Sequence, residues 1–297
     1  MAYNNHCATK KMFMLTVFLR GTIGIFLVVL IGYAHSSEEV SKGQERPISL
    51  SMFPGVSPLL LQQRFEKISL LLSKPLNQQV VFRTRKNYIE YFNAIKNEEF
   101  EIAIVSAFDY VRIRKNSRYI PILSRNDSSV TVLITTDEDI HYLDDLAGKR
   151  IGFPPKTAGA SMMGRYLLTK NNLKPADYQS IFYTNHLSCI QAIINHNVDA
   201  CFTGEKMLRE VEKYKKMDYK ILIESPKISQ QLILIHPDLE DKVESIKDIL
   251  LSLNETDEGR EALEQAYLFV LGEFDDRQYD ENERILHYME SEIDSNE

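Results

Sequence analysis

The chain has 297 residues and a formal net charge of −7, and 44% of its residues are hydrophobic. This composition is that of a globular protein that can bury a core, and the length allows one large domain or two smaller ones. The acidic charge argues against nucleic acid or an anionic membrane surface as the main partner. A small anionic ligand is still allowed, because backbone N–H groups can bind one locally.

The N-terminus has the pattern of an export signal. Residues 1–36 contain three Lys or Arg residues and no acid, and 21–34 is an uninterrupted apolar run. This run is short for a membrane-spanning helix and typical of a signal-peptide core, and small residues follow it. We therefore expect export to the periplasm with cleavage after Ser36. An uncleaved membrane anchor is the alternative, because apolar residues extend back to Met12 through a single charge.

Strands and helices then alternate along the chain. Residues 37–46 are polar and predict a flexible linker, and the apolar–polar alternation of 47–54 predicts a strand. Ser57 followed by Pro58 predicts a helix start, with Ser as the N-cap. The elements predicted next are a strand at 78–84, a helix at 87–100, a strand running into a helix at 101–115, and strands at 119–125 and 129–136.

The same alternation restarts at 144–155, where a turn and short helix lead into a strand. The elements that follow are a helix at 160–173, a strand at 178–184, helix 186–197, strand 198–204, helix 207–217, strands 219–225 and 230–237, and helices 239–254 and 258–271. This order predicts an α/β protein with two lobes, each a mostly parallel sheet flanked by helices, and a ligand cleft between them. The expected boundaries are 47–130 plus 232–285 for lobe 1, 131–231 for the inserted lobe 2, and a polar tail at 286–297.

Standard catalytic and nucleotide-binding motifs are missing from the sequence. It contains no G-x-S-x-G, Walker P-loop, H-E-x-x-H or G-x-G-x-x-G pattern. We therefore expect neither an enzyme nor a bound cofactor or metal. Cys189 and Cys201 would be the only cysteines after cleavage. A disulfide is one interpretation and two buried thiols is the one we favour, while the absence of a close His partner argues against zinc.

Four strand-to-helix turns are expected to converge on the cleft, because ligands prefer domain interfaces and the carboxyl ends of parallel strands. These turns are 53–58, 105–110, 154–161 and 183–186. The polar and aromatic candidates in them also have purely structural interpretations. Ser57 and Thr157 can cap helices, Phe53 and Tyr110 can pack in the core, and His186 can be a cap or a surface residue.

Several segments together resemble a known family. They are NYIEYFNAIKNEEFEIAIVSAFDY (87–110), YLDDLAGKRIGF (142–153), HLSCIQAIINHNVDACFTG (186–204) and GEFDDRQYD (272–280). In their order and spacing they resemble the substrate-binding proteins of ABC importers in the phosphate/phosphite/phosphonate group, over about residues 47–280. The resemblance implies the two-lobed periplasmic-binding-protein fold, in which the lobes close on the ligand about a hinge.

The resemblance also implies an anion site at the turn 154–161. In phosphonate-binding relatives, Ser and Thr hydroxyls of this turn and the following helix N-terminus hold the phosphonate oxygens. Here Thr157 retains one hydroxyl, and Ala158 and Gly159 replace two others. Ser161 lies further along the turn.

Two more positions carry over from the family. His186 matches a residue that touches the anionic group, and Tyr110 matches an aromatic residue that lines the pocket. The expected ligand-binding residues are Thr157, His186 and Tyr110, followed by Ser161, Ser57 and Phe53.

The expected function is that of a monomeric solute-binding protein. It would capture a small anionic solute of the phosphonate or phosphate type and deliver it to an ABC permease. The alternative is a membrane-associated sensing domain that signals to a separate partner protein, which an uncleaved anchor would favour. An enzyme on the same fold would need a reactive group in the cleft, for which Cys189 and His186 are the candidates.

Overall fold

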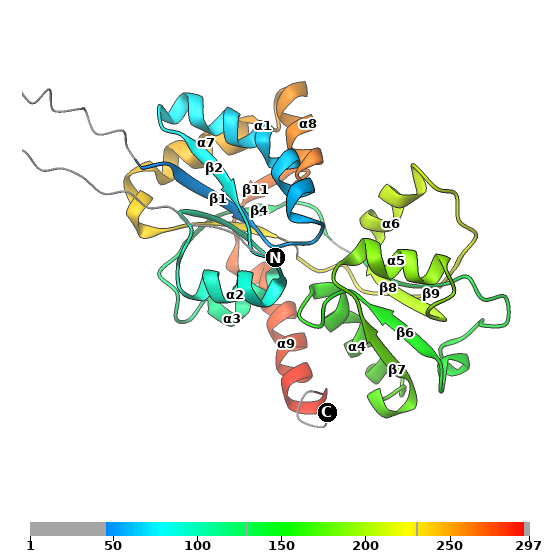
Figure 1. Ribbon diagram of the computed structural model, residues 1–297. Coiled ribbons are helices and arrows are strands. Elements are labelled where there is room, and N and C mark those ends of the chain that lie inside the picture. Colours follow the sequence, from blue (N-terminus) through cyan, green and yellow to red (C-terminus); the bar gives the residue numbers. More distant parts are fainter. Residues whose placement is uncertain (1–45, 129, 230, 294–297) are drawn as a thin grey trace, which may run out of the picture. The chain divides into compact units, whose positions relative to one another are not determined.

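The computed structural model describes residues 46–128, 130–229 and 231–293, which contain two β-sheets flanked by helices (Figure 1). The predicted export signal at 1–36 and nearly all of the linker lie outside the described residues. Within the described part of the chain, no helix is both long enough and apolar enough to cross a membrane.

The first sheet has six strands in the order β11-β4-β10-β3-β1-β2. Their bounds are β1 (Ile48–Met52), β2 (Val80–Arg83), β3 (Ile102–Val105), β4 (Ile120–Arg125), β10 (Leu232–Ile235) and β11 (Leu271–Glu273). Strand β1 pairs in parallel with β2 and β3, whereas β10 and β4 pair antiparallel with their neighbours.

The second sheet has five strands in the order β7-β6-β8-β5-β9. Their bounds are β5 (Thr131–Thr135), β6 (Arg150–Phe153), β7 (Gln179–Phe182), β8 (Ala200–Gly204) and β9 (Lys220–Glu224). Strand β6 pairs in parallel with β7 and β8, and β5 pairs antiparallel with β8 and β9. Both sheets are therefore mixed. The antiparallel pairs involve the strands next to the two connections between the sheets, 126–130 and 225–231.

Nine α-helices are found in the described residues. Their bounds are α1 (Pro58–Leu76), α2 (Tyr88–Lys96), α3 (Ala107–Ile113), α4 (Gly159–Lys170), α5 (His186–Ile194), α6 (Glu205–Glu212), α7 (Val243–Ser252), α8 (Asp257–Gln265) and α9 (Asp280–Tyr288). Short 3-10 helices occupy Leu143–Leu146, Pro175–Asp177, Pro237–Lys242 and Asp276–Tyr279, and a π-helical turn follows α9 at Met289–Ile293. The sequence pattern did not predict α9, because the first five residues of this helix, 280–284, are all polar or charged.

Alternating side chains place a core on each face of both sheets. In β3, Ile102 and Ile104 pack with helices α1, α7 and α8, while Ala103 and Val105 face the side of α2 and α3 (Figure 1). In β5, Leu133 packs with α4 on one face, and its neighbours pack against α5 and α6 on the other. This two-sided burial explains why the strands are continuous apolar runs.

Cys189 and Cys201 form a disulfide that joins α5 to β8, with a Cα–Cα distance of 6.2 Å. Both side chains are fully buried. The favoured interpretation of two buried thiols was therefore wrong. Sequence spacing could not decide this, because only the register of β8 beside α5 brings the two sulfur atoms together. A disulfide agrees with an oxidising compartment.

Candidate functional site

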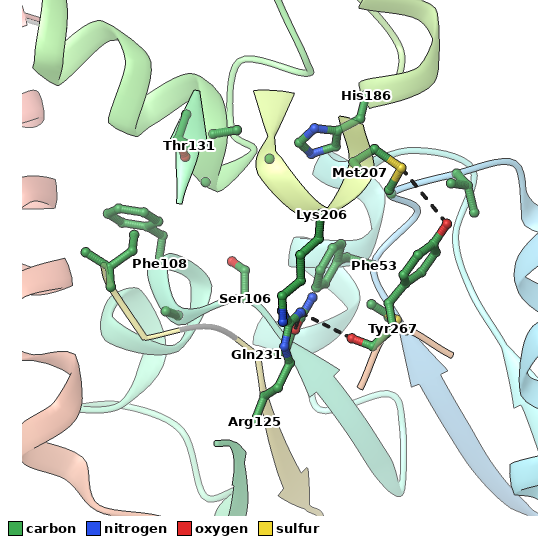
Figure 2. A pocket seen from close by; sticks show the side chains of 18 of the residues that line it. Phe53, Ser106, Phe108, Arg125, Thr131, His186, Lys206, Met207, Gln231 and Tyr267 are labelled. Atoms are coloured by element: carbon green, nitrogen blue, oxygen red, sulfur yellow. Dashed lines mark hydrogen bonds between the residues drawn. The ribbon is translucent and has the colours of Figure 1, made fainter. Parts of the chain in front are cut away.

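A cavity of about 150 Å³ is lined by residues from both sheets and their helices (Figure 2). Each of the four predicted turns contributes to its wall, which confirms that they converge. The contributions from these turns are Phe53, Gly55, Val56, Ser106, Ala107, Phe108, Gly159, Ala160 and His186.

The N-terminus of α4 forms one part of this wall. Gly159 and Ala160 are the first two residues of the helix and both line the cavity. The Ser161 amide donates to the Ala158 carbonyl at 2.9 Å, whereas the amides of Gly159 and Ala160 have no acceptor within the helix. The N-cap, Ala158, has no side-chain oxygen to offer them. These N–H groups and the helix dipole favour an anion at this place.

His186 is the first residue of α5 and its ring faces the cavity (Figure 2). The side chain of Asn185 caps this helix by accepting from the amide of Ser188 at 2.9 Å. The Nδ1 atom of His186 lies 3.1 Å from the hydroxyl of Thr203, which leaves Nε2 for a ligand. Burial lowers the pKa of His186 to about 4, so the ring is neutral at pH 7 and offers a hydrogen bond rather than a charge.

Arg125, at the end of β4, is a cavity residue that sequence analysis missed. Its side chain is only 4% exposed, so its charge needs partners. The guanidinium donates to both carboxylate oxygens of Asp127. It also donates to Oε1 of Gln231 at 2.6 Å and to the carbonyl of Tyr267 at 3.2 Å (Figure 2). Four of its five N–H groups are thereby occupied.

Lys206, near the start of α6, is the second missed cation. Its ammonium pairs with the carboxylate of Asp127 and lies 4.2 Å from the centre of the Phe269 ring. Burial and the neighbouring guanidinium of Arg125 lower the pKa of Lys206 to about 8. Lys206 is thus charged at pH 7. Lys206 is the second residue of α6, which directly follows β8, so including this fifth strand-to-helix turn among the candidates would have found it.

Two aromatic residues of the wall have unusual backbone angles. Tyr267 and Phe269 have φ angles of 59° and 52°, in the left-handed region that costs a non-glycine residue about 1–3 kcal/mol. The bond from Arg125 to the Tyr267 carbonyl and the bond from the Phe269 amide to Leu263 O, at 3.2 Å, hold this conformation. Tyr267 directly follows the C-cap of α8, Ala266, where a left-handed residue commonly ends a helix.

Comparison with known proteins identifies the family of this chain. The sequence matches the family described as "ABC transporter, phosphonate, periplasmic substrate-binding protein" over residues 50–279. The chain belongs to this family. It is therefore the substrate-binding component of a transporter rather than an enzyme, and the family is periplasmic.

Solved structures share the two-lobed fold of this phosphonate family. PhnD1 from Prochlorococcus marinus, in complex with methylphosphonate, has a TM-score of 0.74 at 16% identity, covering 82% of this chain and 98% of that one. A binding protein of an ABC phosphonate transporter from Pseudomonas aeruginosa has a TM-score of 0.73 at 16% identity, covering 83% and 87%. A Xanthomonas citri protein bound to chloride has a TM-score of 0.70 at 10% identity, covering 83% and 99%. No curated protein matches the sequence.

Two of the six expected binding residues, Phe53 and His186, line the cavity of this phosphonate-family protein. The Phe53 ring lies 5.6 Å from the ring of Tyr88, which also lines the cavity. Ser57 instead caps α1 by accepting from the amide of Leu60 at 3.4 Å, and its side chain is exposed. Thr157 is partly buried before α4, outside the set of described residues that line the cavity.

The other two residues have structural partners. The hydroxyl of Tyr110 donates to Asp276 at 2.8 Å, and its ring packs edge-on against Phe274 and Tyr279. Ser161 is fully buried and donates to the carbonyl of Pro154 at 2.9 Å. These hydrogen bonds orient both hydroxyls away from the cavity wall described above.

The low pKa of His186 has a measurable effect on stability. Its pKa is about 4 when folded, below the ordinary value near 6.5, so between these values the unfolded chain binds a proton that the folded chain does not. Stability is therefore lost as the pH falls through this range. The drop in melting temperature between about pH 7.5 and about pH 5 should be smaller in His186→Gln than in the wild type. The exposed His141→Gln should show the wild-type drop, and an equal drop in all three proteins would contradict the assignment.

Proposed function

We propose that this substrate-binding protein binds a small phosphonate, or a closely related phosphorus anion, in the cavity and delivers it to a membrane permease. One observation carries the proposal: the uncapped N-terminus of α4, the neutral His186 and the cations Arg125 and Lys206 face one cavity. The residues that line it in the described part of the chain include no Asp or Glu. The cavity thus favours an anion although the whole chain is acidic.

The roles follow from this geometry. The first amides of α4 bind the phosphonate oxygens, Nε2 of His186 donates to one of them, and the ring of Phe53 packs on the apolar part of the ligand. We propose that the lobes, residues 47–130 plus 232–285 and residues 131–231, close about the two connections. Closure then brings the Thr157 hydroxyl to the anion. Tyr110, Ser57 and Ser161 support the wall of the site.

The remaining expectations concern the cell. We propose that residues 1–36 direct export, that cleavage follows Ser36, and that the mature protein acts as a monomer beside its permease. N-terminal sequencing of the protein recovered from the periplasm tests the cleavage. Family membership favours transport over the sensing alternative.

Methylphosphonate is expected to raise the melting temperature of the purified protein. A ligand at a hundred times its dissociation constant stabilises the folded state by about 2.7 kcal/mol. Methanesulfonate has the same shape and less charge, so it is the matched control and should shift the transition less. Phosphite, phosphate and longer alkylphosphonates complete the panel. No shift with any phosphorus anion would contradict the proposal.

His186→Ala and Thr157→Ala are expected to weaken this binding. A hydrogen bond to a charged group contributes about 1.5–3 kcal/mol, which is roughly a tenfold to hundredfold change in affinity. Calorimetric titration of both variants with the tightest anion measures the change. Unchanged affinity in both would remove these two residues from the site and leave the panel result standing.

A further inference from the structure

Lys206 has hydrogen-bonding capacity that the described residues do not use. Its ammonium carries three N–H groups, and among those residues it contacts the Asp127 carboxylate and the face of the Phe269 ring. Arg125 differs, because four of its five N–H groups are already bonded within the protein. Lys206 is 38% exposed, so a ligand can reach it.

The cluster of Arg125, Asp127 and Lys206 has a net positive charge. Two cations share one carboxylate, and that carboxylate accepts a bidentate bond from Arg125. An additional anion at Lys206 would neutralise the excess positive charge of the cluster. The site is partly desolvated, so the attraction between the anion and the ammonium is stronger than in water. An ammonium group there would instead be repelled by both Arg125 and Lys206.

Lys206 and the first residues of α4 line the same cavity and follow neighbouring strands. Helix α4 follows β6 and helix α6 follows β8, and these strands pair in parallel, Ile151 with Ala200 and Gly152 with Cys201. The carboxyl ends of paired strands lie about 5 Å apart at the same edge of a sheet. Since Lys206 and the first residues of α4 line one cavity, a single ligand in that cavity can contact both. Phe53 and Phe269 border the same cavity and suit a short apolar chain between the two ends.

We propose that the ligand carries a second acidic group, held by Lys206, so that the substrate class is a phosphonate with a carboxylate two or three carbons away. This inference rests on the proposed function, because the phosphonate end is assigned to α4. It excludes aminoalkylphosphonates as preferred ligands. The carboxylate shares the Lys206 ammonium with Asp127, and the same ammonium lies over the face of the Phe269 ring.

The test compares three ligands of similar length by calorimetric titration of the purified protein. The ligands are 3-phosphonopropionate with an acidic end, propylphosphonate with an apolar end, and 3-aminopropylphosphonate with a cationic end. The carboxylated ligand is expected to bind roughly tenfold to a hundredfold more tightly than propylphosphonate, and the amine most weakly. Equal affinity of the first two, or preference for the amine, would overturn the inference.

Lys206→Met keeps the length of the side chain and removes the charge. It is expected to weaken both anions through the loss of charge and to abolish the preference for 3-phosphonopropionate, so that the two ligands bind with similar affinity. Lys213→Met is the matched control, because Lys213 ends the same helix, is exposed and pairs with Glu210. An intact preference in Lys206→Met would overturn the inference. Binding of none of the three ligands to the wild type would instead contradict the proposed function.

Discussion

Replacing Gly159 by leucine is expected to abolish ligand binding while leaving the protein folded. A Cβ atom at Gly159 would lie 3.3 Å from Cδ2 of Phe108, which already fills the space beside the helix start. The rest of a leucine side chain must then extend into the cavity and cover the first amides of α4. Overpacking of this kind costs about 1–3 kcal/mol, and the loss of the amide contacts adds to it. We expect the affinity for methylphosphonate to fall at least roughly a hundredfold.

Gly204 supplies the matched control for this substitution. It lines the same cavity and is the N-cap of α6, but an added Cβ would meet no atom within 4 Å. Gly204→Ala should therefore bind methylphosphonate with nearly the wild-type affinity, and Gly159→Ala should lie between the two. Calorimetric titration of all three variants measures this order. Equal effects at the two glycines would show that α4 does not hold the anion.

Removing the disulfide by the double substitution Cys189→Ala and Cys201→Ala is expected to lower the free energy of unfolding by about 3 kcal/mol. The bond closes a short loop, with a sequence separation of 12, and so restricts the unfolded chain. The two sulfur atoms also fill the core between α5 and β8, so their loss leaves space. The midpoint of urea unfolding should shift to a lower urea concentration, and the melting temperature should fall by about 6–12 °C.

Reduction of the wild type separates the two contributions. A reducing agent opens the bond and keeps both sulfur atoms in the core, so it should reproduce most of the fall seen in the double variant. Ligand affinity should remain unchanged in both experiments, because neither cysteine lines the cavity. Identical urea midpoints for the oxidised and reduced wild type would contradict the role of the bond in stability.

The alternation of strands and helices could be predicted because apolar side chains in β1, β3 and β10 alternate or run continuously between clear helix caps such as Ser57 and Asn185. The parallel or antiparallel direction of the strands could not be predicted. Strands β4 and β5 follow each other without an intervening helix, and only the sheet order shows that β4 and β10 pair antiparallel. Helix α9 is stabilised by packing of Ile285 and Leu286 rather than by a visible apolar stripe.

The position of the site could be predicted because ligand sites follow the carboxyl ends of strands. The charged side chains of the site could not be predicted. Arg125 ends a strand and Lys206 begins a helix, where cations usually face solvent, and 80 positions of sequence separate them. The hydroxyls of Tyr110 and Ser161 were expected in the site, but each donates to a neighbour that local sequence does not reveal, Asp276 and Pro154.

The bonds of Arg125 couple the two connections between the sheets. Asp127 lies in the connection 126–130 and Gln231 lies in the connection 225–231, and both accept from the same buried guanidinium. A bend in one connection therefore displaces a group to which the other is bonded. The Arg125 guanidinium therefore links the two connections, and a movement of one is transmitted to the other. In the lobe closure proposed above, a displacement of one connection relative to the other would break a buried hydrogen bond to the Arg125 guanidinium.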